Sequence, residues 1–352
     1  MVLGKSLITA SFLVISLCGG LLGEERDAAE ATLRTASSPH MGTIVRIVAD
    51  CDDAEQFMEA TRAAFRRIEE IEQICSDYRP DSEILQLSAK SPTKSPVRVS
   101  DELWQVLQRA KAVHAASGGA FDPTVGPLTK EWRRFRRRKE LDPDRIERSL
   151  AAVGMRHLVL HPEMQAVSLH TAGMRIDLGG IAKGYALDAA LTTLRKEGID
   201  RALVDAGGDL AIGAAPRGKP GWRVGIAGLD PRQPPLLVSM LSNAAVATSG
   251  DAYQFLEIDG KRYSHILNPR TGYGVTHRGT VTVFAESATD ADAWASALSI
   301  LGPEGAPQVL QERPKLAAWM EFLKDDRPFT WVSPNLGGWL AEHTGDSDPA
   351  AD

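Results

Sequence analysis

Apolar residues that recur every three or four positions predict the main helices of the chain. Ser100 can cap a helix over residues 101–116, which Gly118 and Gly119 would end. Further helices are expected near residues 144–153, before Lys196 and over 288–301. The longest helical pattern covers residues 54–78, with its repeat at Phe57, Thr61, Phe65, Ile68, Ile71 and Cys75.

Alternating or short apolar runs predict the strands. Residues 41–50 alternate, "HLVLH" and "AVSLH" flank "PEMQ" as a hairpin, and "MRIDL" is expected to be a third strand. Residues 79–97 are polar and proline-rich, so a loop is expected there. Asp259 and Gly260 predict a hairpin turn. The remaining expected strands are "RALVD", "DLAIGA", "WRVGIA", "LLVSML", "AAVATS", "YQFLEI", "RYSHIL", "GTVTVFA", "LAAWMEF" and "FTWV". This mixed order predicts an α+β fold with mixed sheets and packed helices.

The first residues have the pattern of a secretory signal peptide. Lys5 precedes an apolar run that ends at Leu17, and small residues and then charges follow, so residues 1–23 are expected to be removed on export. Cys18 stands where a lipoprotein cysteine would lie, but Leu17 precedes it where a small residue is usual. Cleavage with or without lipidation therefore stays open. The tail at 345–352 is expected to be disordered.

Composition narrows the class of protein. Of the 352 residues, 43% are hydrophobic and 24% charged, and the net charge of -6 disfavours non-specific binding to nucleic acid. The one dense basic run is Arg133 to Glu140, either an anion or lipid-headgroup patch or a solvated helix face or loop. Cys51 and Cys75 could pair in an exported protein or could be buried thiols.

Several common catalytic motifs are absent from the sequence. It has no P-loop, no dinucleotide fingerprint after a strand, no H-E-x-x-H and no G-x-S-x-G. Instead it carries glycine-rich or acidic turns that could present backbone groups to a ligand. These are "GGAFDPTVGPL" from 118, "DLGGIAKG" from 177, "DAGGD" from 205, "TSGD" from 248 and "SHILNPRTG" from 264. Together they suggest a large ligand with phosphates and a ring, although each alone could be a capped tight turn.

Two of these segments carry candidate side chains. The turn at 177–184 leads into a helix N-terminus, which favours an anion, and Lys183 could add a positive charge there. Asp177 would repel that anion and is better suited to accept hydrogen bonds from a ring N–H. Asp292 and Ser296 are four residues apart, so they face one side of a helix and could supply oxygen ligands to Mg²⁺ or Ca²⁺. Capping of that helix by its acidic first turn is the alternative.

Read in order, these segments resemble the ApbE family of FAD:protein FMN transferases. The resemblance covers residues 38–322 and includes "MGT" at 41, "YRPDSEI" at 78, the turns quoted above and "ATDADAWASAL". It implies a T-fold-like architecture. It also implies Mg²⁺-dependent transfer of FMN from FAD to a Thr or Ser hydroxyl of a target protein, with release of AMP.

The resemblance also implies roles for particular residues. His265 matches the family's candidate catalytic histidine, and a histidine near its free pKa of about 6.5 suits a general base. Gly180, through its carbonyl, and the Asp292 and Ser296 side chains match the metal ligands. The FAD-contacting positions are Met41, Tyr78, Ala120, Phe121, Asp122, Asp177, Lys183 and Ile266.

Two features depart from the family pattern. "TKEWRRFRRRKE" follows "GPL" where an apolar, glycine-containing stretch is common, and Ser296 stands where threonine is common. We expect an exported enzyme in the periplasm or anchored to the membrane, whose acceptor is a membrane redox subunit. An FAD pyrophosphatase and a non-catalytic FAD-binding protein are the alternatives.

Overall fold

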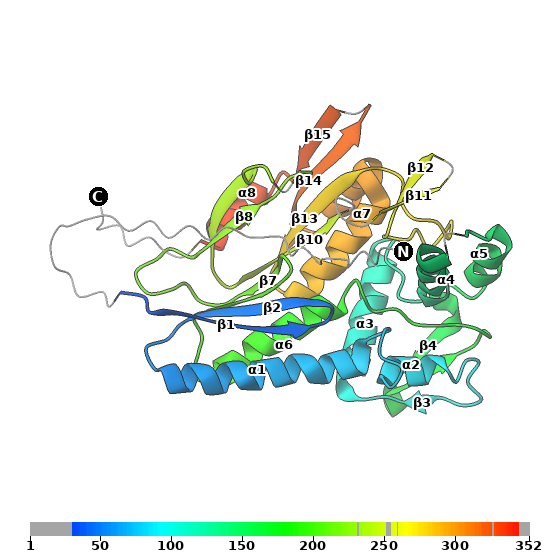
Figure 1. Cartoon of the computed structure of the whole chain (residues 1–352), viewed down its shortest axis with the longest axis horizontal. Coiled ribbons are helices and arrows are strands. Elements are labelled where there is room, and N and C mark those ends of the chain that lie inside the picture. The colour runs from blue at the N-terminus through cyan, green and yellow to red at the C-terminus, as the bar shows by residue number, and fades with distance from the viewer. Residues whose placement is uncertain are drawn as a thin grey trace, which may run out of the picture.

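The computed structural model describes residues 30–138, 140–230, 232–250, 255–258, 260–325 and 327–344. The expected signal peptide and the 345–352 tail lie outside these residues. An antiparallel eight-stranded sheet forms the centre (Figure 1), in the order β1-β2-β6-β7-β10-β13-β14-β15. Its strands are β1 (Leu33–His40), β2 (Thr43–Asp50), β6 (Ala202–Ala206), β7 (Asp209–Ile212), β10 (Ala244–Gly250), β13 (Gly279–Ala285), β14 (Ala317–Lys324) and β15 (Arg327–Val332).

Three helices cover one face of this sheet and bury the larger core. Asp53 caps α1 by accepting hydrogen bonds from the N–H groups of Glu55 and Gln56, and the apolar spacing of α1 turns its buried stripe toward the sheet. In α7, Gly302 has a φ of 68° and Pro303 follows, so the helix kinks there. The three helices are α1 (Ala54–Cys75), α6 (Ala182–Lys196) and α7 (Ala288–Gln311).

The opposite face of the sheet packs against a smaller layer. Trp222 on one strand and Trp339 on a short helix are both buried in this second core. The layer consists of the hairpin β8 (Trp222–Ile226) and β9 (Leu237–Leu241) with α8 (Leu336–Glu342). The central strands β7 and β13 are therefore buried on both sides, while the edge strands β1 and β15 are largely exposed, and the predicted α+β class is confirmed.

The remaining elements flank one end of the three-layer body (Figure 1). A three-stranded sheet has the order β3-β5-β4, and β11 pairs with β12 in a separate hairpin. These elements are α2 (Glu83–Ser88), β3 (Val97–Arg98), α3 (Asp101–Ala116), α4 (Gly126–Arg138), α5 (Pro143–Leu150), β4 (Leu158–His161), β5 (Ala166–Leu169), β11 (Phe255–Ile258) and β12 (Lys261–Ser264). Two 3₁₀ turns lie at Met155–His157 and Pro162–Met164. Among the described residues, no helix has both the length and the apolar character needed to cross a membrane.

Three local predictions were wrong. The 79–97 segment contains α2, because Ser82 caps it at Leu85 N–H and Ile84 and Leu87 are buried. "MRIDL" is extended but forms no strand: Ile176 N–H donates to Ser88 Oγ and Asp177 N–H to Pro123 O, so a sheet ladder is replaced by loop contacts. "RYSHIL" ends as a strand at Ser264, which leaves the next residue in a turn.

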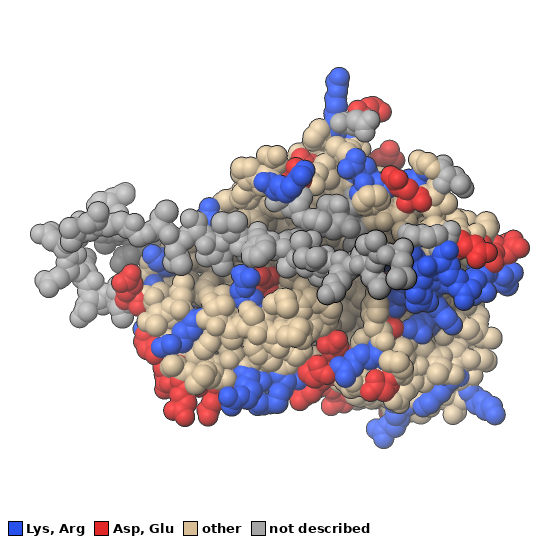
Figure 2. Space-filling model, in the orientation of Figure 1, with Lys and Arg blue, Asp and Glu red and all other residues tan. Residues whose placement is uncertain are grey.

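The basic run lies on α4 rather than in a loop. Trp132 and Phe135 are buried on its inner side, whereas Arg136, Arg137 and Arg138 are exposed. Figure 2 shows Lys and Arg side chains gathered where Figure 1 places α4. Only Arg136 to Arg138 therefore form a solvated helix end, whereas Arg133 and Arg134 are half-buried.

Cys51 and Cys75 are free and buried. Cys51 precedes α1 and Cys75 ends it, so the 22-residue helix separates them by about 33 Å. That distance excludes a disulfide between them.

Candidate functional site

The turn before α6 brings the backbone close to a hydroxyl on α7. A Cβ at Gly180 would lie 2.8 Å from Ser296 Oγ and 3.4 Å from Phe121 Cε2. Only glycine fits this contact without a shift, and it places three predicted residues together. Ile181 gives α6 no side-chain cap, and the first N–H groups of the helix donate within the fold instead, Ala182 to Leu178 O and Gly184 to Asp292 Oδ2.

Asp292 lies one turn before Ser296 on α7 and is held against α6. Its Oδ2 accepts a hydrogen bond from Gly184 N–H at 3.0 Å, and the residue is 6% exposed. Burial raises the pKa of the Asp292 carboxyl to about 7, although the Lys183 ammonium opposes that rise. The predicted spacing of Asp292 and Ser296 on one helix face thus holds.

Lys183 is paired with a carboxylate that sequence reasoning did not assign. Its Nζ forms an ion pair with Asp209 Oδ2, and Asp209 Oδ1 accepts a hydrogen bond from Thr248 N–H at 3.2 Å. Burial alone would lower the pKa of Lys183, but the Asp209 and Asp292 carboxylates outweigh it and raise that pKa. Asp209 is the acid that ends "DAGGD", so the motif itself pointed to a functional carboxylate. Its partner Lys183 belongs to another motif 26 residues away, so the pair could not be predicted from the sequence.

The oxygen groups in this centre fit a hard divalent cation. The Gly180 backbone, the Asp292 carboxylate and the Ser296 hydroxyl are oxygen donors of the kind that Mg²⁺ prefers. A buried carboxylate whose pKa is raised by desolvation gains from a nearby positive ion. The contact of Gly180 with Ser296 leaves no room for a side chain between them.

Asp177 lies in a second polar cluster beside this turn. Thr129 Oγ1 donates to Asp177 Oδ2 at 2.7 Å, and Gly179 N–H donates to Oδ1 at 2.8 Å. Burial and the nearby Asp177 raise the pKa of Asp77, against the effect of Arg133. Both Asp177 oxygens therefore already accept a hydrogen bond, which fixes the carboxylate in place.

Tyr78 is a large ring held at the surface of that cluster. It is 74% exposed, and the Arg133 guanidinium lies 3.7 Å from the ring centroid. Arg133 also pairs with buried Asp77 at 2.6 Å, so α4 orients the ring. An exposed aromatic ring with one supported face suits stacking on a planar ligand.

The other predicted residues lie in neighbouring turns. Ala120, Phe121 and Asp122 are buried, and Arg270 Nη2 donates to Gly118 O at 2.7 Å, which joins their loop to the 264–272 loop. There His265 is exposed, and Ile266 N–H donates to Ser264 Oγ at 3.1 Å.

Met41 lies in the β1–β2 turn with a φ of 50°. Its N–H donates to Glu72 Oε2 at 2.9 Å. A Cβ at Gly207 would lie 3.0 Å from Thr43 Oγ1, so this turn adjoins "DAGGD". One centre thus contains Gly180, Lys183, Asp292 and Ser296. Met41, Tyr78 and His265 lie in other segments, outside this centre.

Known proteins share the sequence pattern of this chain. The model of the ApbE family matches residues 41–320. A FAD:protein FMN transferase of Treponema pallidum is 34% identical over 329 residues, covering 88% of this chain and 90% of the relative. One from Escherichia coli K12 is 32% identical over 308 residues, covering 85% and 87%.

Solved structures have the same fold. The flavin transferase ApbE of Vibrio cholerae has a TM-score of 0.77 at 28% identity, covering 88% of this chain and all of that one. The apo flavinyl transferase ApbE of Pseudomonas stutzeri has a TM-score of 0.79 at 26% identity, covering 90% and 99%. The fold is that of a flavin transferase. This chain belongs to the ApbE family.

Proposed function

We propose that this protein transfers FMN from FAD to the hydroxyl of a threonine or serine in a target protein, with release of AMP. The observation that carries the proposal is the convergence of the Gly180 turn, Lys183, Asp292 and Ser296 in one centre. Relatives that bear this activity match the chain over most of its length.

The reaction exchanges a phosphoanhydride bond for a phosphoester bond. The acceptor hydroxyl oxygen attacks the phosphorus on the FMN side of the pyrophosphate, and the new O–P bond forms as the P–O–P bond breaks. AMP leaves with the bridging oxygen. Mg²⁺, held by the Gly180 carbonyl, Asp292 and Ser296, would neutralise the charge on the pyrophosphate oxygens.

Residues of the chain supply the rest. The positive end of the α6 dipole favours the pyrophosphate, and Lys183 adds positive charge while Asp209 holds it in place. His265, which is exposed, would take the hydroxyl proton. Tyr78 stacks on a ring of FAD, and Asp177 accepts a hydrogen bond from a ring N–H through a remaining lone pair.

The proposal includes the location of the protein. We propose that residues 1–23 direct export and that the acceptor is an extracytoplasmic segment of a membrane redox protein. We propose lipidation of Cys18 as an alternative that would anchor the protein to the membrane. Mass spectrometry of the mature N-terminus from fractionated cells tests both: a chain beginning near residue 24 without lipid, or one beginning at acylated Cys18. An intact leader in the cytoplasmic fraction contradicts export.

A mass assay tests the activity itself. The protein is incubated with FAD, Mg²⁺ and a domain that carries a candidate acceptor threonine, and acceptor mass and AMP are followed together. We expect an FMN-sized mass gain that His265→Ala and Asp292→Ala abolish. AMP and free FMN with an unmodified acceptor would indicate a pyrophosphatase. Bound but intact FAD would indicate a flavin-binding protein.

A further inference from the structure

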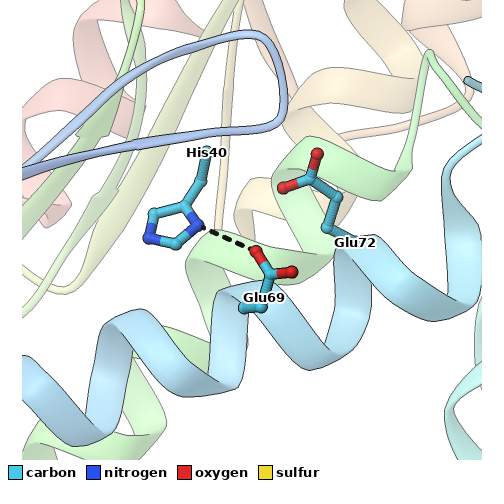
Figure 3. A group of neighbouring side chains, drawn as sticks. All are labelled: His40, Glu69 and Glu72. Carbon is cyan, nitrogen blue, oxygen red and sulfur yellow. Dashed lines mark ion pairs between the residues drawn. The ribbon is translucent and has the colours of Figure 1, made fainter. Parts of the chain in front are cut away.

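Three potential metal ligands converge on the side of α1 that faces β1. His40 ends β1, and Glu69 and Glu72 lie three residues apart on α1, so both glutamates face the same side of that helix. One ligand atom from each residue lies within 4.8 Å of the other two. Figure 3 shows the imidazole and the two carboxylates around a common space.

The imidazole of His40 is held in position but has no hydrogen bond. Its side chain is 11% exposed, and both ring nitrogens are buried without a hydrogen-bond partner. The ring stacks on Phe65 with centroids 5.7 Å apart. Nδ1 lies 3.5 Å from Glu69 Oε2, close enough for an ion pair but outside hydrogen-bond geometry. A buried ring nitrogen without a hydrogen bond is costly, and Nε2 has no ion-pair contact either, so the ring points to a ligand.

The two carboxylates keep oxygens that can reach the same space. Glu69 pairs with Arg79 through Oε1, which leaves Oε2 toward His40. Arg79, and to a smaller extent His40, lowers the pKa of Glu69, so this carboxylate is charged at neutral pH. Glu72 uses one oxygen to accept Met41 N–H.

A groove gives access to this cluster. A cavity of about 620 Å³ lies between β1 and α1, and its lining includes His40, Phe65 and Glu69. It has room for an ion and for the water molecules that would complete a coordination shell of three protein ligands.

We propose that His40, Glu69 and Glu72 bind a first-row divalent transition-metal ion, of which Zn²⁺ is the probe. One imidazole nitrogen with two carboxylates suits such an ion, whereas the oxygen-only donors at Asp292 suit Mg²⁺. The ion would supply the partner that the His40 nitrogens lack. Through Glu72 it would also steady the Met41 turn. The proposal does not depend on the activity of the α6–α7 centre.

Zinc binding in excess Mg²⁺ tests the proposal, because Mg²⁺ occupies oxygen-only sites. Equilibrium dialysis uses the full chain carrying Cys18→Ser, since that thiol could bind zinc itself. The informative variants are His40→Ala and Glu72→Gln. Glutamine keeps an acceptor for Met41 N–H but loses the charge. The matched controls are His170→Ala, an exposed histidine after β5, and Glu70→Gln, the neighbour that pairs with Arg67.

We expect one zinc per chain, an affinity at least about tenfold weaker in both informative variants, and no change in the controls. Zinc should also raise the unfolding temperature of the parent and the controls but not of the variants. If His40→Ala fails to fold, Glu72→Gln decides the matter. A parent that binds no zinc, or variants that bind it as tightly as the parent, would overturn the site and leave a plain His40–Glu69 ion pair.

Discussion

Gly184 N–H on α6 donates to Asp292 Oδ2 on α7 at 3.0 Å. The same glycine lies against the Ala288 carbonyl, so a side chain there would collide with the start of α7. This close approach of two helices holds the carboxylate of the proposed metal site.

Gly184→Ala should therefore destabilise the protein by about 1–3 kcal/mol, because its Cβ must push α7 away. Gly337→Ala is the matched control: it is also in a helix, but its Cβ would meet nothing within 4 Å. Alanine there should be neutral or slightly stabilising. Urea unfolding of both variants measures the difference, and equal midpoints would contradict the packing argument.

Ser296→Ala should raise the Mg²⁺ concentration for half-maximal FMN transfer by more than about tenfold, since one oxygen ligand is lost. Ser296→Thr keeps the hydroxyl and should retain near-normal Mg²⁺ dependence. Titration of transfer rate against Mg²⁺ compares them. An alanine variant with the metal dependence of the parent would remove Ser296 from the proposed ligands.

Lys183→Met should lower the free energy of unfolding by about 2–3 kcal/mol, because it leaves the buried Asp209 carboxylate without its cation. The cost is set below that of a fully buried pair because the Lys183 side chain is 32% exposed. Lys183→Met with Asp209→Asn should regain most of the stability but no activity. Denaturant unfolding and FMN transfer, measured on both variants, separate the two effects.

The Asp50–Arg217 pair should contribute stability that depends on pH. Arg217 donates to both oxygens of Asp50, whose side chain is fully buried. Burial alone would raise the pKa of Asp50, but Arg217 outweighs it and lowers that pKa. Because its pKa is lower in the folded state, the Asp50 carboxylate stabilises the folded protein at pH values above its ordinary pKa of about 4. This stabilisation is lost as the pH falls through the folded-state pKa.

Arg217→Met should therefore reduce stability most at neutral pH and progressively less below about pH 4. Arg223→Met, at an exposed arginine of β8, should leave the pH profile unchanged. Unfolding free energies measured from pH 7 to pH 3 provide the test. Parallel profiles for parent and Arg217→Met would contradict the assignment.

The thiols should be unreactive in the folded state. Burial raises the pKa of Cys75 to about 12, and both Cys51 and Cys75 are buried. A thiol reagent added to a Cys18→Ser protein should label neither cysteine until denaturant is added. A native disulfide between them, seen by mass under non-reducing conditions, would contradict the fold.

Local patterns predicted what depends on local contacts. The Asp292–Ser296 face follows from helical spacing, the start of α1 follows from its apolar stripe, and the boundaries of α3 follow from its cap and glycine stop, whereas α1 ends three residues earlier than expected. Helix α4 also has that spacing, at Leu128, Trp132 and Phe135, but the dense arginines between these positions left helix and loop equally open from the sequence. The family membership predicted from ordered motifs is confirmed.

What depends on long-range pairing was not predictable from the chain alone. Asp209 became part of the centre only when β7 brought it to Lys183, and Thr129 met Asp177 across 48 residues. "MRIDL" has strand-like residues, but the loop contacts of its backbone replaced a ladder. Helix α2, Glu83–Ser88, was too short to be recognised by periodicity.

The central claim, transfer to a protein hydroxyl, is tested most directly by running the reaction in H₂¹⁸O with FAD, Mg²⁺ and the acceptor domain. Transfer predicts one AMP for each flavinylated acceptor and no ¹⁸O in AMP or in the acceptor-bound phosphate, because the attacking oxygen comes from the side chain. Free FMN carrying ¹⁸O, with AMP in excess over modified acceptor, would show that water is the nucleophile and would contradict the account.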